Sequence, residues 1–375
     1  MKIIHKIFAI VVIILFCVSC TNGRTVSIEI FDSVEYTPSH ATGFIIMSNN
    51  EGATLLRVTR PWQGDAVVEQ TLAMFPSKEL AAGYDGEYIV GPARRIVCMS
   101  TSHIAMLDAI GEVSTIVGVS GKQYIMNEAV ANNKEIKDVG YDSSLDYEML
   151  IALRPDVVLM YGVAAENTAV TSKLRELGIP YLYLGDYTEQ SPLGKAEWMV
   201  AVAEILGCRE RGEALFSDIA ARYEDIRKGV NRSNRPKVMF NLPYQDVWYM
   251  PSDDSYMVRL VEDAGGDYIY KGVNPTGGSR GISLEEALLL VNEADLWLNV
   301  GQCKKLDELR TLAPHFATAP VVCRGDVYNN NLRQTPAGGS DFWESAIVRP
   351  DVVLRDMVTI MEYGDSALYY HRRLE

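Results

Sequence analysis

The amino-acid sequence predicts an α/β protein with two Rossmann-like parallel-sheet lobes, joined by a long rigid α-helix and preceded by a β-rich extension. Short apolar strands alternate with helices of about ten residues in two separate stretches. A helical run lies between these stretches, and a turn-rich segment precedes them. The predicted division is a leader over 1–19, a tether and β-rich extension over 20–92, a first lobe over 93–190, a linker helix over 191–230 and a second lobe over 231–375.

The N-terminus predicts export. Lysines near the start precede the unbroken apolar run Ile7–Phe16, which is too short to span a bilayer but fits a secretory leader. Ser19 followed by Cys20 resembles the lipobox of bacterial lipoproteins, in which the cysteine is diacylated and becomes the first mature residue. Cys17 stands where that motif usually has leucine, and a cleaved leader without lipid is the alternative. No later apolar run is long enough for a transmembrane helix.

The segment 20–92 predicts several short strands separated by turns. Polarity alternates over 26–30 and around 53–58, and glycines and prolines punctuate the rest. We expect this extension to pack on the lobe that follows it.

The two lobes share a strand–helix rhythm. In the first we expect strands at 95–99, 115–119, 155–160 and 180–184, and helices at 104–110, 145–153 and 170–177. In the second we expect strands at 237–241, 295–300 and within 321–327, and helices at 255–264, 284–291 and 351–361.

The linker over 191–230 has apolar residues at helical spacing, and Gly207 and Gly212 are the points at which it can divide into two helices. A helix of about 20 residues spans about 30 Å, which is enough to cross a domain-sized gap.

The net charge argues against nucleic-acid binding, and the cysteine spacing argues against a cysteine metal site. The formal net charge of −14, with no basic run to offset it, argues against nucleic acid. Cys98, Cys208, Cys303 and Cys323 are far apart and lack metal-ligand spacing. An exported chain can pair some of them in disulfides, but we expect mainly buried free thiols.

A similar phrase occurs once in each lobe. Glu148 lies in the first turn of a helix that leads through Arg154-Pro155-Asp156 into a buried strand, and Glu285 has the same position before 294–298. A carboxylate there also stabilises its own helix by about 0.3–1 kcal/mol without any partner.

The order of these phrases, with Arg95-Ile96-Val97, Ile116–Val119 and the helix from Lys195, resembles the substrate-binding proteins of iron–siderophore, haem and cobalamin ABC importers. The resemblance covers about residues 94–360. It implies that Glu148 and Glu285 dock onto a permease in the inner membrane, with Glu286 an adjacent substitute. It also implies a monomer, anchored by lipid at the periplasmic face of the inner membrane or at the outer membrane.

The ligand is expected between the lobes, beyond the carboxyl ends of the strands. Serine and threonine near a strand end can instead cap a helix, any one aromatic can be core, and the arginine of the 276–280 loop can be solvated. The predicted ligand-binding residues are Ser100, Thr101, Ser102, His103, Lys122, Tyr124, Tyr161, Tyr244, Trp248, Arg280, Gln302 and Trp343.

The predicted ligand is a siderophore, haem or a corrinoid, and no resident cofactor is expected. Five scattered histidines argue against a bare-metal site. The motifs HExxH, GxGxxG and a phosphate-binding Walker loop are missing from the sequence, and we expect no enzyme. A lipoprotein metal chelatase is the alternative function, and a surface adhesin or sensor is a third class.

Overall fold

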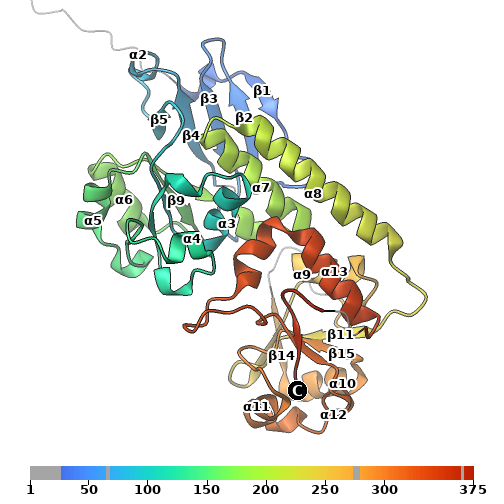
Figure 1. Cartoon of the computed structure of the whole chain (residues 1–375). Helices are drawn as coiled ribbons and strands as arrows, with labels where there is room; N and C mark the ends of the chain where they lie inside the picture. Colours follow the sequence, from blue (N-terminus) through green and yellow to red (C-terminus); the bar gives the residue numbers. More distant parts are fainter. Residues whose placement is uncertain (1–26, 65–67, 273–278, 365–366) are drawn as a thin grey trace, which may run out of the picture.

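The computed structural model describes residues 27–64, 68–272, 279–364 and 367–375. Two α/β lobes are joined by a pair of helices, and a separate β-sheet lies on the first lobe (Figure 1). In Figure 1 the extension is blue, the first lobe teal to green, and the second lobe yellow to red below them. None of the helices within the described ranges is both long and apolar enough to cross a bilayer.

The extension is a five-stranded sheet in the order β1-β2-β3-β4-β5. The first four strands are antiparallel neighbours, whereas β5 runs parallel to β4. The strand predicted over 26–30 is wrong where it is described: Ile28–Ile30 is a 3-10 turn capped by the Ser27 hydroxyl, and Val26 lies outside the described residues. The elements are β1 (Ser33–Tyr36), β2 (Phe44–Ser48), β3 (Thr54–Val58), β4 (Gln70–Phe75), α2 (Lys78–Ala81) and β5 (Tyr88–Val90).

The first lobe contains a fully parallel sheet in the order β10-β9-β6-β7-β8. Its strands are short and almost wholly buried, which is typical of a parallel sheet covered on both faces. The elements are β6 (Ile96–Cys98), α3 (Thr101–Ala109), β7 (Ile116–Val119), α4 (Glu128–Ala131), β8 (Lys137–Asp138), α5 (Tyr147–Leu153), β9 (Val157–Tyr161), α6 (Thr168–Glu176) and β10 (Tyr181–Leu184).

The second lobe has a sheet in the order β13-β11-β15-β16-β17, in which β17 alone is antiparallel to its neighbour. The segment 321–327 is mostly helical, because α12 continues to Gly325, whose φ of +72° ends it. The elements are β11 (Lys237–Phe240), β12 (Val247–Met250), α9 (Tyr256–Asp263), β13 (Asp267–Tyr268), β14 (Arg280–Ser283), α10 (Leu284–Glu293), β15 (Leu296–Leu298), α11 (Leu306–Leu312), α12 (Pro320–Arg324), β16 (Val327–Asn329), α13 (Pro350–Met361) and β17 (Arg372–Arg373).

The linker is two packed helices, α7 (Pro192–Ile205) and α8 (Arg209–Gly229). The chain turns at Gly207, whose φ is +68°, whereas Gly212 lies inside α8. A β-carbon on Gly212 would come within 2.7 Å of the Ala203 side chain, so this glycine lets the two helices approach closely. The rigid connection between the lobes is therefore a helix pair, from which α8 extends to the second lobe (Figure 1).

Every residue of α7 is buried, including three charged ones. The Glu197 carboxylate accepts hydrogen bonds from the Tyr36 hydroxyl at 2.7 Å and from the backbone N–H groups of Ser39, His40 and Ala41 at 2.7–2.8 Å. Hydrogen bonds to a charged group each contribute about 1.5–3 kcal/mol, so this carboxylate fixes the extension to the linker.

We expect Glu197→Gln to destabilise the protein by about 2–4 kcal/mol, because the side-chain N–H₂ would face backbone N–H donors in a buried site. Chemical denaturation followed by circular dichroism measures this loss. The matched control is Glu210→Gln, an exposed residue of α8. Equal denaturation midpoints for the two variants would contradict the role assigned to Glu197.

Candidate functional site

The loops at the carboxyl ends of the parallel strands in both lobes face one another, and we call them together the inter-lobe surface. The Thr101 hydroxyl, at the start of α3, donates to the carbonyl oxygen of Trp343 at 3.2 Å. The Gln190 side chain, after β10, donates to Asp254 of the second lobe at 2.7 Å. Ligands of open α/β sheets bind at such strand ends.

A third contact brings the lobes close beside β7. A β-carbon on Gly339 would come within 1.9 Å of the Tyr124 carbonyl oxygen, so only glycine fits there. Beside it, the Glu344 carboxylate accepts the backbone N–H groups of Met126 at 2.8 Å and Asn127 at 2.6 Å. The predicted residues Thr101, Tyr124 and Trp343 are thus brought together.

The loop after β6 does not present the predicted set of side chains. Ser100 caps α3, its hydroxyl accepting the Ser102 backbone N–H at 3.3 Å, as the capping alternative predicted. Ser102 is buried, and His103 is fully buried with Nε2 4.0 Å from Asp186. Burial lowers the pKa of His103, which keeps the ring neutral. The prediction that Ser102 and His103 line the ligand is therefore wrong in this arrangement.

Lys122 also differs from the prediction. Its ammonium group donates to the carbonyl oxygens of Asn133 and Ile136, so it closes a loop of the first lobe instead of offering a free charge. Tyr124 and Tyr161 are exposed at the ends of β7 and β9, where the sequence placed them.

Trp248, predicted to bind the ligand, lies instead in the core of the second lobe. Its indole is fully buried between Trp297 and Phe316, with ring centroids 5.4 and 5.1 Å away. Its Nε1–H donates to the Phe240 carbonyl oxygen at 2.8 Å. Because side chains alternate along β12, Trp248 faces the core of the second lobe and its neighbour Tyr249 faces solvent.

The other second-lobe candidates are exposed. Tyr244 lies in the turn after β11 with 68% of its surface accessible, and Trp343 is half exposed. Gln302, after β15, accepts a hydrogen bond from Gln334 at 2.8 Å. Arg280 begins β14, and the neighbouring residues 276–278 of its predicted loop lie outside the described residues.

Sequence reasoning missed four residues of the inter-lobe surface. Tyr141 and Tyr187 are exposed after β8 and β10. Asp142 and Asp253, one in each lobe, each have a buried carboxylate oxygen without a hydrogen-bond partner among the described residues. Such oxygens favour a ligand that brings N–H or O–H donors. The only sequence signal was their position after a strand, and β8 is too short and polar to have been predicted.

Glu344 carries the strongest electrostatic perturbation at the lobe contact. Burial raises its pKa to about 7, with Asp341 and Asp108 adding to the rise and the two backbone N–H groups opposing it. Arg333 neutralises Asp341 through an ion pair at 2.6 Å. Between pH 4.5 and about 7, Glu344 is therefore mainly protonated in the folded protein, whereas a free glutamate side chain is mainly ionised.

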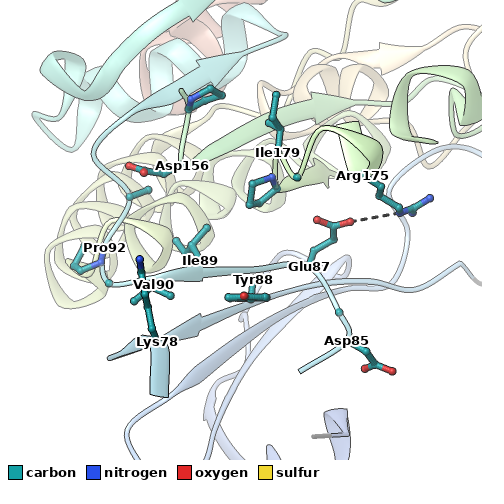
Figure 2. A pocket seen from close by; sticks show the side chains of 16 residues that line it. Lys78, Asp85, Glu87, Tyr88, Ile89, Val90, Pro92, Asp156, Arg175 and Ile179 are labelled. Carbon is teal, nitrogen blue, oxygen red and sulfur yellow. Dashed lines mark ion pairs between the residues drawn. The ribbon is translucent and has the colours of Figure 1, made fainter. Parts of the chain in front are cut away.

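Two cavities lie away from the predicted residues. One of about 530 Å³ lies on the α8 side of the lobe contact and is lined by Arg222, Arg349 and Glu344 among others. Another, of about 920 Å³, lies between β5 and the amino ends of β9 and β10, with the Glu87–Arg175 ion pair on its wall (Figure 2). No predicted ligand residue lines either cavity.

The predicted docking glutamates are both exposed in first helical turns, Glu148 in α5 and Glu285 in α10. Each helix runs back from the carboxyl ends of its sheet to the amino end of the next strand, so both glutamates lie on the strand-end side. Hydrogen bonds from its own backbone N–H and from Ser283 lower the pKa of Glu285, which keeps it charged.

Within the described ranges, no group of three or more His, Cys, Asp or Glu side chains is arranged to hold a metal ion. The four cysteines are free: Cys98 and Cys303 are buried as expected, whereas Cys208 is half-buried and Cys323 is exposed.

Comparison with known proteins identifies the family to which this chain belongs. A family model described as periplasmic binding protein matches residues 96–327. An uncharacterized lipoprotein of Methanocaldococcus jannaschii is 27% identical over 284 residues, which cover 72% of this chain and 65% of that protein. A second uncharacterized lipoprotein of that organism is 26% identical over 263 residues, covering 65% of each. The chain thus spans 65% of the length of each of these relatives.

Solved structures confirm the predicted fold class. A periplasmic haem-binding protein of Pseudomonas aeruginosa superposes with a TM-score of 0.55 at 18% identity, over 72% of this chain and 92% of that one. The periplasmic vitamin B12-binding protein of Vibrio cholerae gives 0.54 at 16% identity, over 74% and 99%. A possible iron-binding protein of Staphylococcus epidermidis gives 0.57 at 18% identity, over 72% and 98%.

The lobe contact should be sensitive to pH through Glu344. A folded-state pKa of about 7, raised from 4.5, means that the contribution of this group to stability is present below pH 4.5 and is lost as the pH rises through 7. Melting temperatures of wild type and Glu344→Gln between pH 5 and 8 test this. The wild type should lose roughly 2–3 kcal/mol more than the variant over that range. Parallel pH profiles would refute the assignment, and Glu128→Gln, an exposed neighbour on α4, is the control.

Proposed function

We propose that this chain, which belongs to the periplasmic binding protein family, is an extracytoplasmic solute-binding lipoprotein of an ABC importer. It binds an iron chelate or a corrinoid at the inter-lobe surface and delivers it to the permease. The protein acts as a monomer, and its role is binding rather than catalysis.

The observation that carries the proposal is that the strand ends of one lobe face those of the other, with direct hydrogen bonds between the lobes beside them. Exposed aromatic rings lie at or after strand ends in both lobes, among them Tyr124, Tyr161, Tyr244 and Trp343. Flat, extended ligands pack on such rings with little loss of side-chain entropy. Asp142 in the first lobe and Asp253 in the second each have a buried carboxylate oxygen without a partner among the described residues.

Lipid anchoring is the second element of the proposal. Cys20 lies outside the described residues, and support comes from its lipobox-like context and from the two relatives named lipoproteins. Acyl chains on the first mature residue would hold the protein at the periplasmic face of a membrane, near its permease.

Docking is the third element. Glu148 and Glu285 are exposed carboxylates, one per lobe, on the strand-end side. Two charges a lobe apart fix orientation and steer encounter more than they add affinity.

The ligand is tested by purifying the protein from rich medium and recording its absorbance and mass spectra. We expect a Soret band, a corrinoid spectrum or a ferric-catecholate band, with one chelate per chain. Protein that carries no chelate, and that binds none when these compounds are added, would refute the proposal. Release of free metal from an added chelate would favour the alternative, a metal chelatase.

We expect the double variant Glu148→Ala, Glu285→Ala to lose at least about 90% of chelate uptake by cells while binding the chelate normally in vitro, because the two charges that orient the protein on the permease are lost. The control is Glu176→Ala with Glu293→Ala. These are exposed residues at the C-terminal ends of α6 and α10, whereas the docking glutamates lie in first helical turns. Full uptake by the docking variant would contradict these roles.

A further inference from the structure

A loop of the N-terminal extension reaches the inter-lobe surface. It follows β3, and the structure describes its residues 59–64. The Gln63 backbone N–H donates to the carbonyl oxygen of Val163 at 3.0 Å, two residues beyond the end of β9. The Thr188 hydroxyl, beyond the end of β10, donates to the Arg60 carbonyl oxygen at 3.0 Å. The loop therefore bridges the ends of two neighbouring strands beside Tyr161.

Close packing fixes this loop in place. The Trp62 ring lies against Tyr183, with centroids 5.4 Å apart and the planes at 85°. A β-carbon on Gly185 would come within 2.5 Å of the Arg60 carbonyl oxygen, and one on Gly162 within 3.1 Å of Trp62. Glycine at both strand ends thus makes room for a segment that lies outside the matched family region.

The loop brings a cation that nothing else in the described structure engages. Arg60 is exposed, and its guanidinium has no ion pair or hydrogen bond among the described residues. The neighbouring Arg57 is instead paired with Glu69 at 2.5 Å. Lys122 is held by carbonyl oxygens, and the buried Lys195 donates to the Asp186 carbonyl at 2.7 Å. Among the described residues, Arg280 on the second lobe is another exposed arginine of this surface without an ion pair.

We propose that the 59–64 loop forms a wall of the ligand site and that Arg60 pairs with an anionic group of the bound chelate. This inference rests on the proposed function, and it assigns part of the specificity of ligand binding to the N-terminal extension. Haem carries carboxylates, cobalamin carries a phosphodiester and ferric catecholates are anionic, so each candidate class offers a partner. A planar guanidinium suits carboxylate and phosphate oxygens because it can donate two parallel hydrogen bonds.

The test uses the full chain in detergent and three probes: haemin, cyanocobalamin and a ferric tris-catecholate. Quenching of tryptophan fluorescence gives the affinity of wild type, Arg60→Ala and Arg60→Lys for each probe that binds. We expect a 10- to 100-fold loss for Arg60→Ala and a smaller loss for Arg60→Lys, which keeps the charge but not the paired donors.

The matched control is Arg57→Ala, which removes an arginine from the same extension and should leave affinity within twofold. Equal affinities of wild type and Arg60→Ala for a bound probe would overturn the inference and leave the proposed function standing. Binding of none of the three probes by wild type would instead overturn the proposed function and the inference with it. Circular dichroism and melting temperature show that each variant is folded.

Discussion

Two buried carboxylates, Glu189 just before α7 and Glu197 within it, fix the N-terminal extension to the linker. Glu189 accepts the backbone N–H groups of Thr42 and Gly43 and the indole N–H of Trp198, while Glu197 accepts those of 39–41. The backbone N–H groups of this loop of the extension thus donate to two carboxylates, one just before the linker helix α7 and one within it. Removing either carboxylate would leave several buried N–H groups unsatisfied, so the extension and α7 form a single structural unit.

The lobes are constrained a second time, at the contact beside β7. There Glu344 bonds to the backbone of 126–127, and Gly339 lies directly against Tyr124. The α7–α8 pair, closely packed at Gly212, is the first connection between the lobes. The contact at Glu344 is a second connection, and because burial raises the pKa of Glu344 to about 7, the stability of this contact depends on pH near neutrality.

Sequence reasoning recovered the lobes because buried parallel strands are continuous apolar runs between capped helices, as at β9 and β10. It missed β8 and β17, which have two residues each, because so short a segment carries no periodicity. It misplaced His103 and Trp248 because their burial depends on α7 and on Phe316, both distant in sequence. Asp142 and Asp253 have no motif at all, and only the folded chain shows that they lack partners.

The way in which the extension packs against the first lobe could not be predicted from the local sequence. It covers β10, an edge strand whose exposed N–H groups would otherwise invite pairing with other chains. Gln70 accepts the backbone N–H of Tyr183, and Glu87 accepts that of Tyr181. A sheet that lies along this edge necessarily has a loop at each end of the strand, and at the carboxyl end that loop meets the inter-lobe surface. The geometry that covers the edge therefore also brings a loop from outside the matched family region to the strand ends of the first lobe, where we propose that it contributes to the ligand site.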